Sequence, residues 1–175
     1  MTSDFEAFSA FPIFEGFSGP ELEILSRFLR PVDFTPGEPV IQEGEVGNQL
    51  YLLVEGEVAV SIRITLPPQL AGRVPQEEKG LVKYTGKDHA IFGEHGLLGE
   101  EPANRTATVT ALSPCRMLEF THRDLEKILE ENPRLAFKLI RNLCRVLAER
   151  LRQANQDIAK LTTVLSLVLE HRHSS

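Results

Sequence analysis

Along residues 31–64, short runs of β-branched and aromatic residues are separated every few residues by glycine, at Gly37, Gly44, Gly47 and Gly56. Such runs are typical of strands, and glycine provides the positive φ that tight turns between strands require. Closely and regularly spaced strands of this kind pack as a small barrel or sandwich.

Strand patterns resume after a segment that has no periodicity. Residues 65–80 hold three prolines, two glycines and scattered charges, so we predict a surface hairpin loop there. In the later segment TATVTA, threonines alternate with Ala107, Val109 and Ala111, which is typical of a half-buried strand. Further strands are predicted at residues 81–84, 90–92 and 115–120.

Helix start signals flank the strand region on both sides. Ser18 with Glu21 and Thr121 with Asp124 have the spacing of capping boxes, which predicts helices that begin at these points. Asn132, followed by proline, predicts the cap and first turn of a further helix. Neither proline nor glycine occurs after that point, so we expect one long C-terminal helix.

Apolar residues recur at heptad spacing in that helix. The two seams are Cys144, Leu151, Ile158 and Leu165, and, displaced by three positions, Leu147, Ala154, Leu161 and Val168. A helix of about 35 to 40 residues, roughly 55 Å long, is too long for the barrel of its own chain to cover both seams. We therefore predict a parallel coiled-coil homodimer through residues 140–168. Packing against the chain's own barrel explains the first turns of the helix equally well.

Composition and charge narrow the class of protein. No apolar run approaches the roughly 18 to 20 residues that cross a bilayer, and the N-terminus lacks the pattern of a secretory signal. We therefore expect a cytoplasmic protein without membrane insertion. Residues 132–175 hold 8 basic and 3 acidic residues, whereas residues 1–131 hold 11 and 22. The basic tail indicates nucleic-acid or membrane contact or, more economically, a solvated helix face lying against an acidic body.

Cysteine and histidine positions do not indicate a metal site. Cys115 and Cys144 lack a CxxC spacing, and we predict that both are buried free thiols. The histidines are not spaced as metal ligands either: His89, His95, His122, His171 and His173. We therefore expect neither a metal nor a cofactor.

The segment FGEHGLLGEEPANRTATVTA, residues 92–111, combines residue types that suit an anion site. Gly93 lets backbone amides approach a ligand, and the EHGLL that follows can form one helical turn whose N–H groups attract an anion. Arg105 adds a planar fork suited to two phosphate oxygens. Glu94 would repel a phosphate unless it accepts a hydrogen bond from a nearby hydroxyl, such as a ribose 2′-OH. The alternative is a tight turn with an incidental Glu–Arg pair.

These residues resemble a known family. The order Phe92-Gly93-Glu94, then Leu97-Leu98, then RTATV from Arg105 is similar to the phosphate-binding cassette of cyclic-nucleotide-binding domains, and FTPGEPVIQEGEVGNQLYLLVEGEVAV, residues 34–60, is similar to the family's first strands. The resemblance implies an α+β fold: an antiparallel, jelly-roll-like β-roll with a short N-terminal helix and C-terminal helices. We expect residues 1–131 to form the β-roll with its flanking helices and residues 132–175 the long lid and dimerisation helix.

The resemblance also implies roles for individual residues. Arg105 would hold the cyclic phosphate, Glu94 the ribose hydroxyl, and amides near Gly93 and Ala107 the other phosphate oxygens. The full set of expected ligand-site residues is Phe92, Gly93, Glu94, Leu97, Leu98, Arg105, Thr106 and Ala107, with Leu97 and Leu98 packing the cassette onto the roll. The lid helix would add Arg150 beside Glu94, Ala154 as space for a purine and Asn155 at the base edge, although a solvated coiled-coil flank explains Arg150 and Asn155 as well.

The chain departs from the family pattern in three places. Ten residues separate Glu94 from Arg105, more than is usual, so residues 99–104 must bulge outward. Asn48 stands where many members have aspartate. Only a few residues follow Leu169, so we expect no DNA-binding helix-turn-helix and no DNA partner.

The favoured function is a stand-alone cyclic-nucleotide receptor, cAMP before cGMP, that signals through its long helix to a separate protein. The alternative is a dimerising scaffold that keeps the fold and binds no nucleotide. An enzyme is disfavoured because we find neither a nucleophile–base pair nor a metal set.

Overall fold

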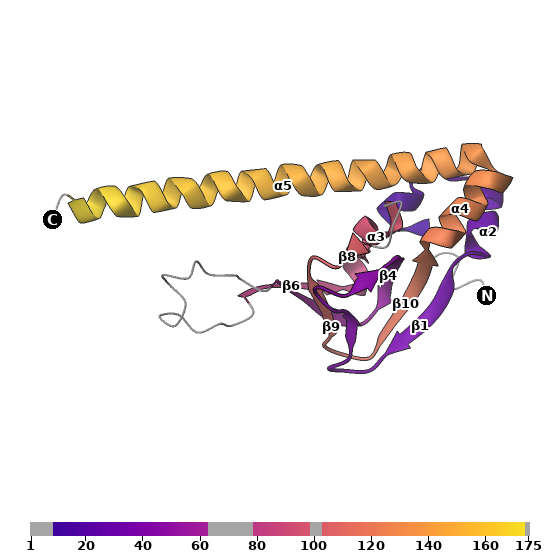
Figure 1. Ribbon diagram of the computed structural model, residues 1–175, viewed down its shortest axis with the longest axis horizontal. Coiled ribbons are helices and arrows are strands. Elements are labelled where there is room, and N and C mark those ends of the chain that lie inside the picture. Colours follow the sequence, from indigo (N-terminus) through magenta and orange to yellow (C-terminus); the bar gives the residue numbers. More distant parts are fainter. Residues whose placement is uncertain (1–8, 63–78, 99–102, 174–175) are drawn as a thin grey trace.

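The computed structural model describes residues 9–62, 79–98 and 103–173 of the 175-residue chain. Residues 65–78 of the predicted loop and residues 99–102 of the predicted bulge lie outside the described residues. A long helix extends along and beyond a β-roll (Figure 1). The fold is α+β with antiparallel sheets, which confirms the predicted fold class.

The roll consists of two four-stranded sheets and a small ribbon, all of them antiparallel. The first sheet has the order β1 (Arg30–Phe34), β10 (Cys115–Thr121), β4 (Gln49–Glu55) and β7 (Ile91–Phe92). The second has the order β2 (Pro39–Ile41), β9 (Thr108–Ala111), β5 (Glu57–Ile62) and β6 (Lys79–Thr85). The ribbon pairs β3 (Val46–Gly47) with β8 (Ala103–Asn104), and Arg105 directly follows β8.

Strand β4 separates two apolar cores because alternate side chains of a strand point to opposite faces. Leu50 and Leu52 belong to a core that packs the first sheet against the helices. Leu53 belongs to the second core, inside the roll, with Val58 from β5 and Val109 from β9. The predicted alternation along β9 is confirmed, since Val109 and Ala111 are buried between less buried threonines.

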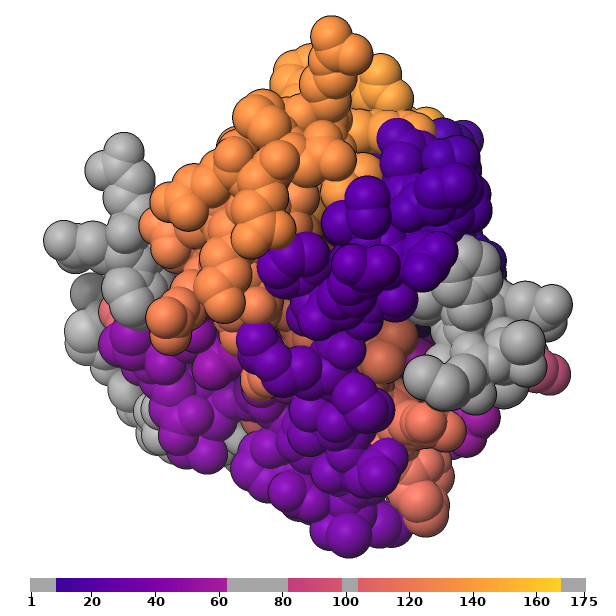
Figure 2. All heavy atoms as spheres, turned by 90° about the vertical axis from the view of Figure 1, so that its right-hand side faces the viewer, coloured from indigo at the N-terminus to yellow at the C-terminus, as the bar shows by residue number. Residues whose placement is uncertain are grey.

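Helices cover the outer face of the first sheet. They are η1 (Pro12–Phe14), α2 (Gly19–Ser26), α4 (His122–Glu131) and the start of α5 (Pro133–His173). Figure 2 shows the indigo N-terminal segment beside the orange segment that contains α4 and the start of α5. The short helices η2 (Gly86–Asp88) and α3 (Glu94–Leu98) lie on the roll.

The predicted helix starts are confirmed by their capping contacts. Ser18 and Glu21 form a capping box at α2, and Thr121 and Asp124 form another at α4. Asn132 accepts the backbone N–H of Leu135 through Oδ1 at 3.2 Å and so caps α5. Each cap satisfies backbone donors that the first helical turn leaves without an intrahelical acceptor.

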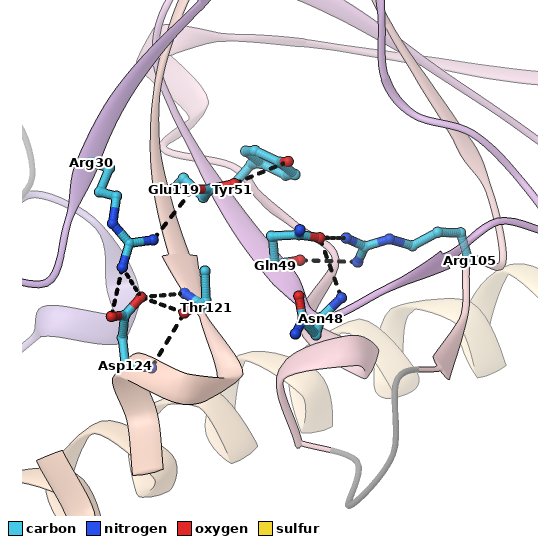
Figure 3. Close-up of polar contacts among 8 residues, drawn as sticks. All are labelled: Arg30, Asn48, Gln49, Tyr51, Arg105, Glu119, Thr121 and Asp124. Atoms are coloured by element: carbon cyan, nitrogen blue, oxygen red, sulfur yellow. Dashed lines mark hydrogen bonds and ion pairs between the residues drawn. The ribbon is translucent and has the colours of Figure 1, made fainter. Parts of the chain in front are cut away.

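Asp124 also ties α4 to the first sheet. Its carboxylate is almost fully buried and accepts two hydrogen bonds from Arg30 of β1, at 2.8 and 2.9 Å. Arg30 also pairs with Glu119, which accepts the hydroxyl of Tyr51 at 3.4 Å (Figure 3). This network fixes the end of β10 against β1 and β4.

Helix α5 changes its surroundings along its length. Its first turns bury Leu135, Ala136, Leu139 and Leu143 in the helix-facing core, whereas every residue from 151 to 167 is exposed. At 1.5 Å per residue the helix is about 60 Å long. The prediction that Cys144 is buried is wrong: Cys115 is buried, but Cys144 is exposed because it lies off the helix face that carries Leu139 and Leu143.

Candidate functional site

A cavity of about 770 Å³ lies between the second sheet, the segment from Phe92 to Ala107, and helix α5. Its sheet side is apolar and consists of Ile41, Val60, Ile62, Tyr84 and Val109. The polar side is lined by Phe92 through Gly96 and by Asn104 through Ala107. Helix α5 closes the third side with Leu147, Arg150, Leu151, Gln153, Ala154 and Asp157.

Arg105 lies on the polar side, directly after β8, and its guanidinium is held by carbonyl oxygens. Nη1 donates to the backbone oxygen of Gln49 at 2.9 Å and to that of Gly93 at 3.2 Å. Nη2 donates to the side-chain oxygen Oε1 of Gln49 at 3.1 Å (Figure 3). The backbone of Arg105 is fixed as well, because its N–H donates to Glu45 at 2.8 Å and its carbonyl accepts from Gly44 at 2.9 Å.

Glycines make room for this guanidinium. A Cβ on Gly47 would overlap the guanidinium of Arg105, and one on Gly93 would overlap both Arg105 Nη1 and the carbonyl of Gln49. Gly93 also has φ +85°, which favours glycine. A Cβ on Gly96 would overlap the carbonyl of Gly47. The three glycines therefore form a seat for the guanidinium.

Burial affects the pKa of Arg105. Desolvation lowers the pKa of its guanidinium, and Tyr51, when ionised, together with Glu94 and Glu45 opposes that effect. The pKa of Tyr51 is raised by burial and by the neighbouring carboxylate of Glu119. An arginine in such a site keeps its charge, and reduced contact with water strengthens its attraction for an anion.

Glu94 begins α3 and its side chain is nearly buried. Its Oε1 accepts a hydrogen bond from Arg150 Nη1 of α5 at 2.8 Å, while Arg150 Nη2 donates to the carbonyl of Ile91 at 2.7 Å. His95 Nδ1 lies 3.6 Å from the same carboxylate oxygen. The pairing of Glu94 with Arg150 thus connects the cassette to the long helix.

The expected site residues do not all lie at the cavity. Leu97 is buried in the helix-facing core, whereas Leu98 is 39% exposed, so the expected packing of Leu98 onto the roll is wrong. Leu98 ends a five-residue helix whose other leucine already fills the core position. Asn155 is exposed and is not among the lining residues, because one helical turn of α5 presents Gln153, Ala154 and Asp157 to the cavity instead.

Sequence reasoning missed two kinds of site residue. Gln49 is neutral and 56 positions from Arg105, so no charge or local spacing marked it. The apolar wall of Ile41, Val60 and Tyr84 looks like ordinary strand core in the sequence, and only the sheet order brings it to one cavity.

The arrangement can bind a ligand with three different parts. An arginine fork suits a phosphate, a buried carboxylate suits a hydroxyl, and an apolar wall suits a flat ring. The family model described as cyclic nucleotide-binding domain matches residues 31–132, which contain this arginine and carboxylate. The chain belongs to the cyclic-nucleotide-binding domain family. The resemblance noted from the cassette is thereby confirmed.

Relatives of this cyclic-nucleotide-binding domain include regulators. A CRP-like cAMP-activated global transcriptional regulator of Mycobacterium tuberculosis is 30% identical over 149 residues, which cover 85% of this chain and 59% of that protein. The chain thus spans less than two thirds of the length of that relative.

Solved structures share the fold. The N-terminal domain of a transcriptional regulator from Streptomyces coelicolor has a TM-score of 0.66 at 27% identity, covering 87% of this chain and 94% of that one. The catabolite activator protein of Thermus thermophilus has a TM-score of 0.69 at 24% identity, covering 86% and 63%. Within the described ranges of this domain, no helix is long and apolar enough to cross a membrane.

Proposed function

We propose that this chain is a cyclic-nucleotide receptor that favours cAMP and transmits ligand binding through α5 to a separate protein. One observation carries the proposal: a single cavity brings together Arg105, the nearly buried Glu94 and the α5 residue Arg150. The chain acts in this proposal by binding rather than by catalysis.

The ligand would occupy the cavity in one orientation. The cyclic phosphate lies at Arg105 and at the backbone near Gly93 and Ala107, and the ribose 2′-hydroxyl donates to Glu94. Phe92 and Thr106 line the same part of the cavity. The purine then lies between the apolar sheet wall and α5, where Ala154 leaves space beside Leu151 and Gln153.

The preference for cAMP is supported by a relative. The Mycobacterium tuberculosis protein is described as cAMP-activated, and its aligned region covers the cassette. Thr106 follows the arginine and lines the cavity, and a hydroxyl at this position is compatible with both cAMP and cGMP. Equilibrium dialysis with labelled cAMP and cGMP tests this preference. Tighter binding of cAMP is expected, tighter binding of cGMP would reverse the assignment, and binding of neither would favour the scaffold alternative.

Signalling through α5 would begin at Glu94. This carboxylate accepts a hydrogen bond from Arg150 of α5, so a ribose hydroxyl that donates to Glu94 would change the contact of the helix with the cassette. Such a differential contact is what couples binding to a conformational change. Hydrogen exchange along residues 133–170 should slow or accelerate with saturating cAMP, whereas identical exchange with and without cAMP would contradict the coupling.

The partner side of the proposal rests on the exposed part of α5. The seam residues Leu151, Ile158, Leu161 and Leu165 are 59% to 70% exposed. We propose that residues 140–168 dimerise and that the combined helices contact the downstream protein. The domain boundary at residue 131 and a cytoplasmic location stay predictions.

A further inference from the structure

The guanidinium of Arg105 is seated entirely on uncharged acceptors in the described structure. Its three hydrogen bonds go to the backbone oxygen of Gln49, the backbone oxygen of Gly93 and the side-chain oxygen of Gln49. Across residues 9–62, 79–98 and 103–173, no carboxylate lies within ion-pair distance of this guanidinium. An arginine that is partly buried and paired only with dipoles keeps its full positive charge for a ligand.

Gln49 makes two of these three contacts, and the direction of its side chain is fixed. Its Oε1 accepts from the backbone N–H of Asn48 at 3.2 Å as well as from Arg105 Nη2 at 3.1 Å. Two donors converge on that atom, so it must be the amide oxygen and not the nitrogen. Figure 3 shows this side chain directed at the guanidinium.

The seat leaves room for a ligand. Arginine has five N–H donors, and three are used here, so two remain among the described contacts for phosphate oxygens. Gly47 and Gly93 lie against the guanidinium and stop it from moving toward the backbone. The protein's own groups therefore hold the guanidinium in place, which reduces the entropy lost on binding an anion.

We propose that Gln49 is the positioning residue for phosphate binding and that its neutrality sets the anion affinity of the site. This inference rests on the proposed function. A carboxylate at position 49 would lie where Oε1 now lies, and it would pair with the guanidinium in the ligand-free state. A phosphate would then compete with that carboxylate for Arg105 and would be repelled by it.

Two substitutions that keep the side-chain length of Gln49 distinguish a role in positioning Arg105 from a purely structural role. In Gln49→Glu the acceptor stays and gains a charge, so the ligand-free protein should melt at the same or a higher temperature while cAMP binds at least roughly tenfold more weakly. In Gln49→Met the acceptor is lost without a new charge, and binding should weaken by only about threefold to fivefold.

A pH series supplies a readout that a structural role would not change. When cAMP binds, its negative charge raises the pKa of the carboxylate in Gln49→Glu, so binding takes up a proton and the affinity of this variant should rise toward wild type as the pH falls from about 7 to about 4.5. The wild-type protein has no carboxylate at that position, and its affinity over the same range provides the reference.

Calorimetric titration of cAMP into the wild type and both variants, with thermal melting of each, decides the proposal. Weak, pH-dependent binding by a stable Gln49→Glu variant supports it. Binding by Gln49→Glu within about twofold of wild type, or affinity that simply follows melting temperature, overturns it. If the wild type itself binds neither cAMP nor cGMP, the proposed function is wrong and the inference about Gln49 is wrong as well.

Discussion

At the residue scale, a few polar side chains determine both the stability of this domain and the chemistry of its cavity. Glu21 shows how: its Oε2 accepts from the N–H and hydroxyl of Ser18, at 2.7 and 2.8 Å, and from Lys138 Nζ at 2.8 Å. These contacts join the start of α2 to α5. The hydrogen bond from Lys138, with those from Ser18, lowers the pKa of Glu21 to about 2 from 4.5.

The lowered pKa predicts a pH dependence of stability. The folded state favours ionised Glu21, so its contribution is complete above about pH 4.5 and is lost as the pH falls toward 2. Because the carboxylate is one-third exposed, solvent screening reduces that contribution to about 1 kcal/mol. Denaturant unfolding of Glu21→Gln should show this deficit at pH 7 and a smaller one at about pH 3. Glu23→Gln, which loses only an exposed pair with Arg27, is the control, and an equal deficit in both variants would contradict the prediction.

Whether the role of a single residue can be predicted from the sequence depends on the chemistry of that residue. Arg105 and Glu94 were found because a fixed charge in a short motif is conspicuous in the sequence. Gln49 was not found, since a neutral amide at the start of a strand has many ordinary uses. Leu98 and Cys144 were misplaced because an apolar residue type indicates burial only when the phase of its helix is known.

At the scale of elements, an ion pair between Arg150 and Glu94 joins helix α5 to the cassette. Arg150 is 40% exposed, while the Glu94 side chain is only 10% exposed, so removing the arginine leaves a nearly buried carboxylate without its main partner. The helix beyond this point has no buried residue in the described range 151–167. The contact of Arg150 with Glu94 and Ile91 is therefore the last polar attachment of α5 to the roll that the structure describes.

Removing that attachment should loosen the helix. Arg150→Ala is expected to lower the free energy of unfolding by about 1–2 kcal/mol, because a buried carboxylate loses its counter-charge. Hydrogen exchange of residues 146–160 should become faster. Arg152→Ala removes only the exposed pair with Glu149 and should change neither quantity. Equal exchange rates in both variants would show that Arg150 does not anchor the helix.

Element starts could be predicted from sequence far better than the cavity. Capping boxes at Ser18 and Thr121 are local patterns, and each stands where it was expected. The order of the strands is not a local pattern. β2 pairs with β9 although most of the strands of the roll lie between them in the sequence, and this pairing brings Ile41 beside Val109 in the cavity wall. The face that α5 turns to the cavity was also not predictable from local pattern. Asn155 was expected there, but Gln153 and Asp157 line the cavity instead, about half a helical turn away from Asn155.

At the scale of the whole molecule, the exposed seam of α5 predicts a partner. Several large apolar side chains are exposed in one row beyond Arg150, which a single chain in water does not favour. A second copy would bury them in knobs-into-holes packing. The same helix faces, at Leu151 and Ala154, also line the cavity, so the proposed dimerisation and the proposed ligand binding would share one element.

The homodimer can be tested by disrupting the seam. Leu161 is 70% exposed in the single chain, and Leu161→Asp should convert a dimer into a folded monomer because it places two like charges in a packed seam. Gln156→Asp, also exposed but off the seam, should stay dimeric. Sedimentation velocity over a concentration series gives the oligomeric state and circular dichroism checks the fold. A wild type that is monomeric at every concentration would contradict the homodimer.

We expect Arg105 to bind the phosphate of a cyclic nucleotide in this cavity. Calorimetric titration of cAMP into nucleotide-free wild type and Arg105→Ala, with Arg152→Ala as the matched arginine control, tests it most directly. Wild type and the control should bind with micromolar or tighter affinity, and Arg105→Ala should lose roughly a hundredfold or more, because a charge-assisted contact to phosphate is removed. Equal affinity in all three proteins, or no heat from a folded wild type with either cAMP or cGMP, would show that Arg105 does not bind a cyclic phosphate.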